Sequence, residues 1–313
     1  MRVADSGSRV PAALGVDQLA ALPALGVGLL YNPALPGYLR ERPDTFDYVE
    51  VIPEMFWTDH GVGANPRFEE LDGWIRELDR VRAVAPVICH NIGLSLGSAD
   101  EFDLSYADHI AAWNARYQFP WHSDHLSFVR ITAADGHDHN AGLAVPVPYD
   151  WDVLELICGR IASVQRAVSA PFLIENNVYF IDVPEQDMSE PEFLNALGRR
   201  TGCGLLLDIH NVYANARNHG FDAFAFIDAL DKERVIEIHI AGGSMLAGMY
   251  TDSHAGPCPP AVWELLEWIA PQLPHLAAIT FEFHDSYYPL LKAAGINAEL
   301  DRARAIWERC RRA

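Results

Sequence analysis

The fold of this chain is decided by one stretch, Val235-Ile-Glu-Ile-His239-Ile-Ala-Gly-Gly243, and by the segment Thr251-Asp252-Ser-His254 that follows it. β-Branched residues crowd a short apolar run that stops at two glycines, which predicts a buried strand over Val235–Ile240 that ends at His239. An imidazole at the carboxyl end of a buried strand, with an Asp-x-His pair brought back beside it, places three potential ligands near one point. This layout is typical of a metal site on a parallel barrel.

The rest of the chain repeats the same unit, a strand-like run followed by a helix-like run. The strand-like runs are Val27–Leu30, Tyr48–Ile52, Val87–Asn91, Trp121–Phe128, Phe172–Asn176, Gly204–Ile209, Val235–Ile240 and Ala278–Phe283. The helix-like runs are Pro36–Glu41, Phe68–Val84, Leu104–Tyr117, Trp151–Val168, Glu190–Arg199, Ala223–Ala229, Pro260–Ala270 and a long helix to the C-terminus. Their number and order predict an α/β fold, a (β/α)8 TIM barrel in one domain.

The alternative architecture is a doubly wound open sheet, but no Gly-x-Gly-x-x-Gly follows the first strand to support dinucleotide binding. We expect residues 1–22 to form a flexible N-terminal leader and residues 23–313 to form the barrel. The longest irregular stretch, Arg130–Pro148, is predicted to be a lid or a partner-facing loop over the mouth of the barrel.

Chemistry on such a barrel lies where the strands end, and these positions are unusually polar here. They carry Glu54, His90-Asn91, Asp124-His125, Glu175-Asn176, Asp208-Ile-His210-Asn211, His239 and Glu282. Lysine and arginine are almost absent from these strand ends, so ordinary ion pairs cannot neutralise the carboxylates. Imidazole, carboxylate and amide oxygen without thiolate suit iron, manganese or zinc, and the excess of ligands indicates roughly two or three metal ions.

Composition excludes other classes of function. The 313 residues carry a formal charge of −20, which opposes binding to nucleic acid. Five scattered cysteines, with no Cys-x-x-Cys spacing, argue against disulfides and thiolate metal sites and favour a reducing cytoplasm. The sequence contains no secretion signal and no apolar run of membrane-spanning length, so we expect a cytoplasmic enzyme that does not contact a membrane.

Several segments together resemble the multinuclear non-haem iron-dependent oxidative enzymes, the family that includes the methanobactin-biosynthesis oxidase. The resemblance covers Gly26 to about Trp307. Its most specific segments are Gly26-Val-Gly-Leu, His90-Asn-Ile-Gly-Leu-Ser-Leu-Gly-Ser98, Ser123-Asp-His-Leu126, Leu173-Ile-Glu-Asn176, Gly202-Cys-Gly-Leu-Leu-Leu-Asp-Ile-His-Asn-Val-Tyr213, Asn218-His-Gly220 and Glu237-Ile-His-Ile-Ala-Gly242. A more distant similarity links the chain to barrels of the endonuclease IV and xylose isomerase type.

The resemblance implies a set of metal ligands. These are His90, Glu175, Asp208, Asn211, His239, Asp252, His254 and Glu282, with either Asp124 or His125 in addition. Asp124 stands where the family usually has glutamate, which leaves the choice between those two residues open. His210 replaces a usual asparagine and either adds a ligand or marks a different substrate. We expect Asp252, His254 and His210 to be catalytic, and Glu54, Asn91 and Asn176 to support the ligands or the substrate.

The resemblance also implies a reaction. The family uses about two or three iron ions, here expected in mixed Fe2+ and Fe3+ states, with molecular oxygen as co-substrate. It modifies residues, often cysteines, of ribosomally made precursor peptides, and a small partner protein commonly presents the peptide. The alternative function is that of a zinc- or manganese-dependent hydrolase, or of a sugar isomerase or epimerase, on the same barrel.

Overall fold

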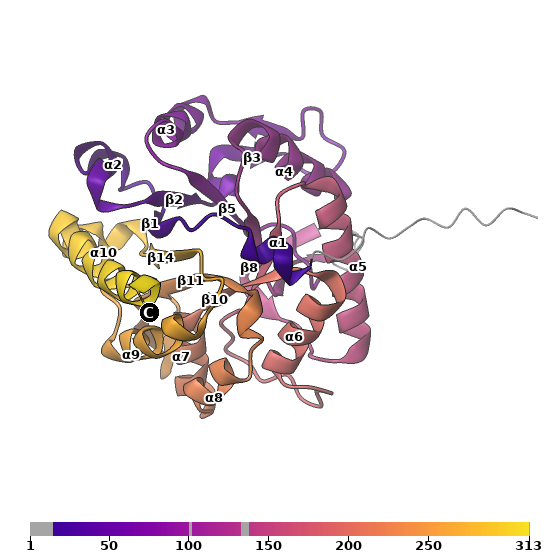
Figure 1. Ribbon diagram of the computed structural model, residues 1–313. Coiled ribbons are helices and arrows are strands. Elements are labelled where there is room, and N and C mark those ends of the chain that lie inside the picture. The colour runs from indigo at the N-terminus through magenta and orange to yellow at the C-terminus, as the bar shows by residue number, and fades with distance from the viewer. Residues whose placement is uncertain (1–14, 100–101, 133–137, 313) are drawn as a thin grey trace, which may run out of the picture.

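The computed structural model describes residues 15–99, 102–132 and 138–312. Eight parallel strands close into a barrel in the order β1-β14-β11-β10-β9-β6-β5-β2, with helices around the outside (Figure 1). The barrel strands are β1 (Gly26–Leu30), β2 (Tyr48–Val51), β5 (Val87–Asn91), β6 (His122–His125), β9 (Phe172–Glu175), β10 (Gly204–Asp208), β11 (Val235–Ala241) and β14 (Ala278–Glu282). The predicted single-domain (β/α)8 barrel is therefore confirmed.

The helices fill the connections between strands, and several begin at an aspartate whose side chain accepts backbone N–H bonds, such as Asp103, Asp150 and Asp208. They are α1 (Val16–Ala20), α2 (Pro36–Glu41), α3 (Asp72–Arg82), α4 (Leu104–Tyr117), α5 (Trp151–Ala167), α6 (Glu190–Thr201), α7 (Ile209–His219), α8 (Ala223–Asp228), α9 (Pro260–Ile269) and α10 (Tyr288–Arg312). α10 is interrupted at Lys292, which has a φ of 52°. No helix in the described ranges is long and apolar enough to cross a membrane.

The interior of the barrel is built in two layers with opposite character. At the amino-terminal end of the strands, α1 places Leu19 against an apolar layer that closes the floor. That layer consists of Tyr48, Ile88, Trp121, Leu173, Leu206, Ile236, Ala277 and Ala278. Buried polar side chains follow toward the carboxyl ends of the strands. The floor therefore excludes water from below, and the chemistry is confined to the opposite mouth.

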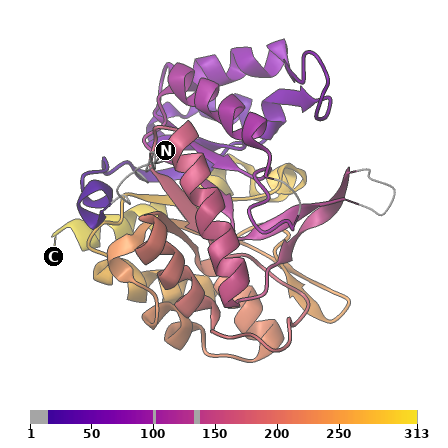
Figure 2. The same ribbon diagram turned by 90° about the vertical axis from the view of Figure 1, so that its right-hand side faces the viewer.

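In the described part of the chain, three small two-stranded sheets lie in the connections between the barrel strands and the helices. They are β3 (Trp57–Asp59) with β4 (Phe68–Glu70), β7 (Ser127–Thr132) with β8 (Asp138–Pro146), and β12 (Ser244–Leu246) with β13 (Met249–Thr251). Figure 2 shows the β7–β8 ribbon extending away from the barrel. This hairpin occupies the stretch Arg130–Pro148, which was predicted to be an irregular loop. That part of the prediction was wrong, because β7 and β8 are paired strands.

Other boundaries also differ from the prediction. The helix expected over Phe68–Val84 is the short strand β4 followed by α3, and the strand expected over Trp121–Phe128 is divided into β6 and β7. β11 continues past His239 to Ala241. Helix α7 was not predicted, because its sequence is polar and follows the strand without a loop.

The structure differs in part from the prediction that residues 1–22 form a flexible leader. Residues 16–20 form α1, and Leu19 is only 1% exposed, because it covers the floor of the barrel. Packed structure therefore begins before residue 23. Residues 1–14 lie outside the described residues.

Candidate metal centre

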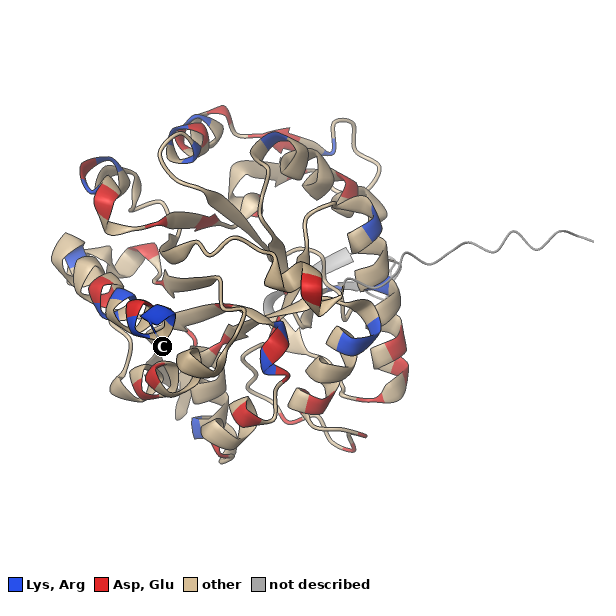
Figure 3. Cartoon of the chain, in the orientation of Figure 1, with Lys and Arg blue, Asp and Glu red and all other residues tan. Residues whose placement is uncertain are grey.

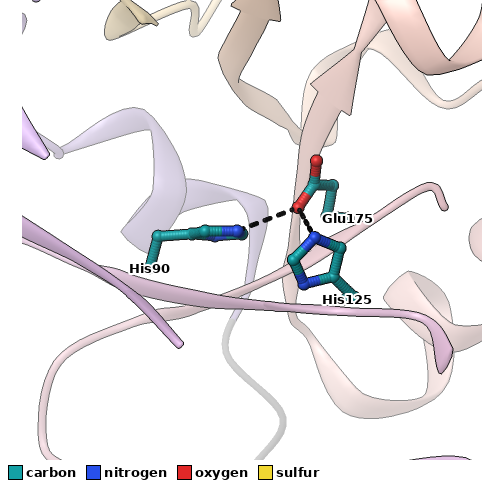
Figure 4. A group of neighbouring side chains, drawn as sticks. All are labelled: His90, His125 and Glu175. Carbon is teal, nitrogen blue, oxygen red and sulfur yellow. Dashed lines mark ion pairs between the residues drawn. The ribbon is translucent and has the colours of Figure 1, made fainter. Parts of the chain in front are cut away.

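The first group of facing ligand atoms joins three neighbouring strands. His90 comes from β5, His125 from the end of β6 and Glu175 from the end of β9. The Nε2 atoms of both histidines lie 3.3 Å from Oε2 of Glu175, so both imidazoles point at one carboxylate oxygen (Figure 4). Two imidazoles and a carboxylate directed at a common point are a typical partial ligand set for iron or zinc.

Strand periodicity bears on the choice between Asp124 and His125. Ser123 faces the interior, because its Oγ lies 2.8 Å from Nδ1 of His90. Side chains alternate along a strand, so His125 shares that face and Asp124 points toward the helices. Asp124 accepts hydrogen bonds from the backbone N–H groups of Leu94 at 2.9 Å and His125 at 2.6 Å. This geometry favours His125 as the ligand and leaves Asp124 to hold the loop after β5.

His239 is the centre of a second group. Its Nε2 lies 2.9 Å from Oε2 of Glu50 and 3.7 Å from Oε1 of Glu237. Its Nδ1 lies 3.3 Å from Oε1 of Glu282 and 3.7 Å from Oε1 of Glu175. Four carboxylates therefore surround one buried imidazole, and Glu175 connects this group with His90 and His125.

Glu50 and Glu237 were not among the predicted site residues. Both lie inside apolar strands, Glu237 two residues before His239 and Glu50 four residues before Glu54, the strand-end residues that the prediction considered. A carboxylate in the middle of a buried strand was the signal that could have found them. Glu237 is anchored, because it accepts hydrogen bonds of 2.8 Å from Nε1 of Trp121 and Oγ1 of Thr280. Apart from the ion-pair contact of Oε2 with His239, the carboxylate oxygens of Glu50 have no hydrogen-bond partner in the described chain.

The Asp-x-His pair closes the site from the loop after β11. Oδ1 of Asp252 lies 3.0 Å from Nδ1 of His210 and 3.1 Å from Nε2 of His254. Nε2 of His254 is also 3.5 Å from Oε2 of Glu282, which links this pair to the His239 group. The predicted catalytic residues Asp252, His254 and His210 thus lie together at the rim of the same centre.

Among the described residues, three sets of potential ligands have atoms within 4.8 Å of one another. They are His90 with His125 and Glu175, Glu50 with Glu237 and His239, and Glu175 with Asp208 and His239. Glu175 and His239 each belong to two sets. The sets therefore form one continuous cluster rather than separate sites.

The pKa values of several residues in this cluster are shifted toward the uncharged form. Burial, aided by Glu237, raises the pKa of Glu50 to about 7, and burial, aided by Asp252, raises the pKa of Asp208 to about 7. Burial also raises the pKa of Glu175 well above its usual value, and it lowers the pKa of His125 to about 4. Burial therefore disfavours the charged form of each of these groups.

Two histidines behave in the opposite way. Burial alone would lower the pKa of His239, but Glu282 and Glu50 raise it well above the usual value. In the same way Asp252 and Glu282 outweigh burial and raise the pKa of His254 to about 10. The carboxylates thus stabilise positive charge at the positions of these imidazoles, which is also what they would do for a metal cation.

Many ligand atoms in the cluster are buried and have no hydrogen-bond partner in the described chain outside the cluster, and several of them meet only as ion pairs between a histidine and a carboxylate. They are both carboxylate oxygens of Glu50, Oε2 of Glu175, both ring nitrogens of His239, Oδ1 of Asp252, Nε2 of His254, Nδ1 of His210 and Oδ1 of Asn211. Unpartnered buried polar atoms are rare because each is costly. None of these carboxylates pairs with a lysine or arginine in the part of the chain that is described. The donor set therefore fits a group of multivalent cations.

The predicted supporting residues contact the backbone around the ligands. Asn176 accepts from the N–H of Asp208 at 2.9 Å and donates to its carbonyl at 2.8 Å, which joins the ends of β9 and β10. Asn91 donates to the carbonyl of Ser123 at 2.8 Å. Glu54 accepts from the N–H of Ile92 at 2.9 Å. These contacts position the ligand-bearing strands relative to one another.

A cleft of about 740 Å³ opens beside His125. Its walls come from the β3 segment, the loop after β5, helix α4 and the β7–β8 hairpin. Its lining residues include Glu54, Trp57, Ile92, Tyr106, Val129 and Arg130. Oε2 of Glu54 is buried in this wall without a hydrogen-bond partner in the described structure. A substrate in the cleft would therefore lie next to the metal centre.

Comparison with known families agrees with this geometry. Residues 24–308 match the model of a family described as the RiPP precursor modification enzyme MbnB/TglH/ChrH, where RiPP denotes a ribosomally made and modified peptide. The chain belongs to this family. The MbnB/TglH/ChrH family consists of enzymes that modify precursor peptides, so its description indicates an enzyme with a peptide substrate.

Relatives that cover most of the chain are found in bacteria. A UPF0276 protein of Caulobacter vibrioides (strain NA1000 / CB15N) is 35% identical over 288 residues, which cover 92% of this chain and 96% of that protein. A UPF0276 protein of Neisseria meningitidis serogroup B is 33% identical over 290 residues, with 88% and 97% covered.

Solved structures share the fold at low sequence identity. Endonuclease IV from Thermus thermophilus has a TM-score of 0.52 at 15% identity and covers 87% of this chain and 99% of its own. A xylose isomerase-like TIM barrel protein from Mycobacterium smegmatis, in complex with magnesium, has a TM-score of 0.51 at 13% identity, with 92% and 99% covered. These similarities confirm the predicted endonuclease IV-like and xylose isomerase-like barrel.

Proposed function

We propose that this member of the MbnB/TglH/ChrH family is a multinuclear non-haem iron enzyme that uses O2 to oxidise a residue, often a cysteine, of a ribosomally made peptide. The observation that carries the proposal is the continuous cluster of buried histidines and carboxylates, in which many ligand atoms face only one another and none is paired with a lysine or arginine of the described chain. Iron would supply oxygen activation and one-electron chemistry, which amino-acid side chains do not offer.

The residues that would hold the metal ions surround two shared ligands. Glu175 directs Oε2 at His90 and His125 and Oε1 at His239, so its carboxylate is oriented to serve two neighbouring positions. The remaining candidate ligands are Asp208, Asn211, Glu282, Glu50 and the pair Asp252 and His254. Glu237 is already bound to Trp121 and Thr280, and we assign it to orienting His239 rather than to a metal.

The cleft beside His125 would bind the peptide. An extended peptide presents backbone N–H groups, and the buried, unpartnered Oε2 of Glu54 is a suitable acceptor for one of them. His210 lies across the site with Nδ1 on Asp252, and we assign it to fixing that carboxylate. The walls of the cleft would also shield the modified residue from bulk water.

Metal analysis after anaerobic purification tests this function. We expect about two or three iron ions per chain and little zinc or manganese. A peptide encoded beside the gene, co-expressed and analysed by mass spectrometry, should change mass only when oxygen is present. Stoichiometric zinc together with oxygen-independent turnover of a sugar or an ester would instead establish the hydrolase or isomerase alternative.

The proposal also includes a small partner protein that presents the peptide. Purification of the chain co-expressed with the products of adjacent genes tests this part separately. A stable complex required for modification would support it, and full modification by the chain alone would refute it.

A further inference from the structure

A second cavity lies outside the metal centre. It has a volume of about 470 Å³ and is lined by the end of β8, the loop after β9 and the beginnings of α6 and α8. Its walls are largely apolar and include the aromatic rings of Tyr149, Tyr179, Phe221 and Phe226. Such a cavity can accept an apolar stem about as long as one amino-acid side chain.

One wall of this cavity contains a buried acid. Glu190, the first residue of α6, is only 5% exposed, and neither carboxylate oxygen has a hydrogen-bond partner in the described ranges. Capping of α6 does not require it, because Ser189 and Glu192 form the capping box. Burial raises the pKa of Glu190 to about 8, with the Tyr149 hydroxyl facing it. Glu190 thus faces only the neutral Tyr149 hydroxyl and has no cationic partner among the described residues, and a ligand could supply one.

The mouth of the cavity is also lined by acidic residues, like the wall that contains Glu190. Asp182 and Asp222 line it, and the side chain of Asp182 is 85% exposed. No lysine or arginine is among the described lining residues. Acidic groups at the mouth, aromatic walls and a buried carboxylate are complementary to a cationic group on an apolar stem.

The cavity adjoins the cleft beside His125. Pro146 lines the cavity, whereas its ladder partner Ser127, directly opposite in the β7–β8 hairpin, lines the cleft. The base of one hairpin therefore separates the two spaces. A peptide that crosses this base would reach both.

We propose that this cavity is a recognition site for a lysine or arginine side chain, with the Glu190 carboxylate as its counter-charge. The assignment of that side chain to the substrate peptide rests on the proposed function. Cation recognition itself does not, since it requires neither iron nor oxygen. The site would fix which residue of the peptide reaches the cleft beside His125.

Fluorescence polarisation with labelled peptides tests the site directly. The probes are fluorescein-Gly-Ser-Ala-Xaa-Ala-Ser-Gly peptides with Xaa as arginine, lysine or norleucine, the last having an apolar stem without charge. We expect the wild-type protein to bind the arginine or lysine probe about tenfold or more tightly than the norleucine probe. E190Q should lose this preference, and E185Q, an exposed charge change nearby, should keep it.

Equal binding of the charged and norleucine probes by the wild-type protein would overturn the proposal, whether or not E190Q folds. Unchanged preference in a folded E190Q would also overturn it. Iron content of E190Q gives an independent readout, which should equal that of the wild type. A protein that holds iron and oxidises its peptide but shows no preference among the probes would refute this site while leaving the proposed function intact.

Discussion

The carboxyl group of Glu50 is buried, has no lysine or arginine partner in the described chain and faces His239 at 2.9 Å. Burial and Glu237 raise its pKa from 4.5 to about 7. In the metal-free protein, the unfolded chain ionises Glu50 above pH 4.5 while the folded chain keeps it protonated up to about pH 7. Its contribution to the free energy of unfolding therefore falls across this interval.

The variant E50Q removes that pH-dependent contribution. We expect the free energy of unfolding of metal-free E50Q, relative to the wild type, to rise between pH 4.5 and 7 and then to remain constant. The total rise should be roughly 2–3 kcal/mol. Urea unfolding at a series of pH values measures it, with E41Q at an exposed position as control. A difference that does not change with pH would contradict the assignment.

Asp124 and His125 provide a matched pair, because they are adjacent but face opposite sides of β6. H125Q should lower the bound iron by about one ion per chain. D124N should keep the iron and lose about 1–2 kcal/mol of stability, because Leu94 N–H bonds to Oδ2 and His125 N–H to Oδ1, and the amide of asparagine offers only one acceptor oxygen for the two. Metal analysis and thermal unfolding of both variants check this, and the reverse pattern would make Asp124 the ligand.

At the residue scale, the sequence predicted the identity of most ligand candidates but not their orientation. His90, Glu175 and His239 were predicted because polar residues at the ends of apolar strands stand out. The choice between Asp124 and His125 needed the contact of Ser123 with His90, which fixes the inward face of the strand. Sequence spacing alone does not reveal which face of a strand meets the site.

Helix α7 shows how one element combines folding and function. Asp208 ends β10, and its Oδ1 accepts the N–H of Asn211 at 2.8 Å, which caps α7. The same residue belongs to the ligand set with Glu175 and His239. The start of the helix therefore orients Asn211 and His210 toward the centre. The segment was predicted as the end of a strand, because its polar residues were interpreted only as site residues.

Two variants of Asp208 separate its capping and ligand roles. Asparagine caps helices about as well as aspartate but is a poor metal ligand, whereas alanine performs neither role. We expect both D208N and D208A to lose bound iron. In the metal-free state D208A should be less stable than D208N by about 1 kcal/mol. Chemical unfolding of the two metal-free variants measures this, and equal stabilities would exclude the capping contribution.

At the scale of the whole molecule, acidic residues are spread over the helices around the barrel, with Lys and Arg mixed among them (Figure 3). The formal charge of −20 leaves the chain with few cations for its interior acids. The barrel was predictable because buried parallel strands are short apolar runs separated by helices. The β7–β8 hairpin was not, because its pairing depends on contacts between strands rather than on an apolar run.

Removal of the metal should therefore lower the stability of the entire fold. Metal ions that bind only the folded chain stabilise it, and their loss leaves mutually repelling carboxylates around His239. We expect anaerobic treatment with a chelator to lower the thermal midpoint by at least about 5 °C near neutral pH. The decrease should be smaller at about pH 5, where protons already neutralise Glu50 and Asp208.

Differential scanning calorimetry of the iron-loaded and chelated protein at both pH values measures these shifts. E175Q is the appropriate control, because it removes the carboxylate shared by two ligand sets and should reduce the difference between the two forms. Readdition of Fe2+ without oxygen should restore the original midpoint in the wild type, which separates loss of metal from irreversible damage. Identical midpoints before and after complete chelation would mean that the buried acids are neutralised by protons, and the cluster would not need metal to fold.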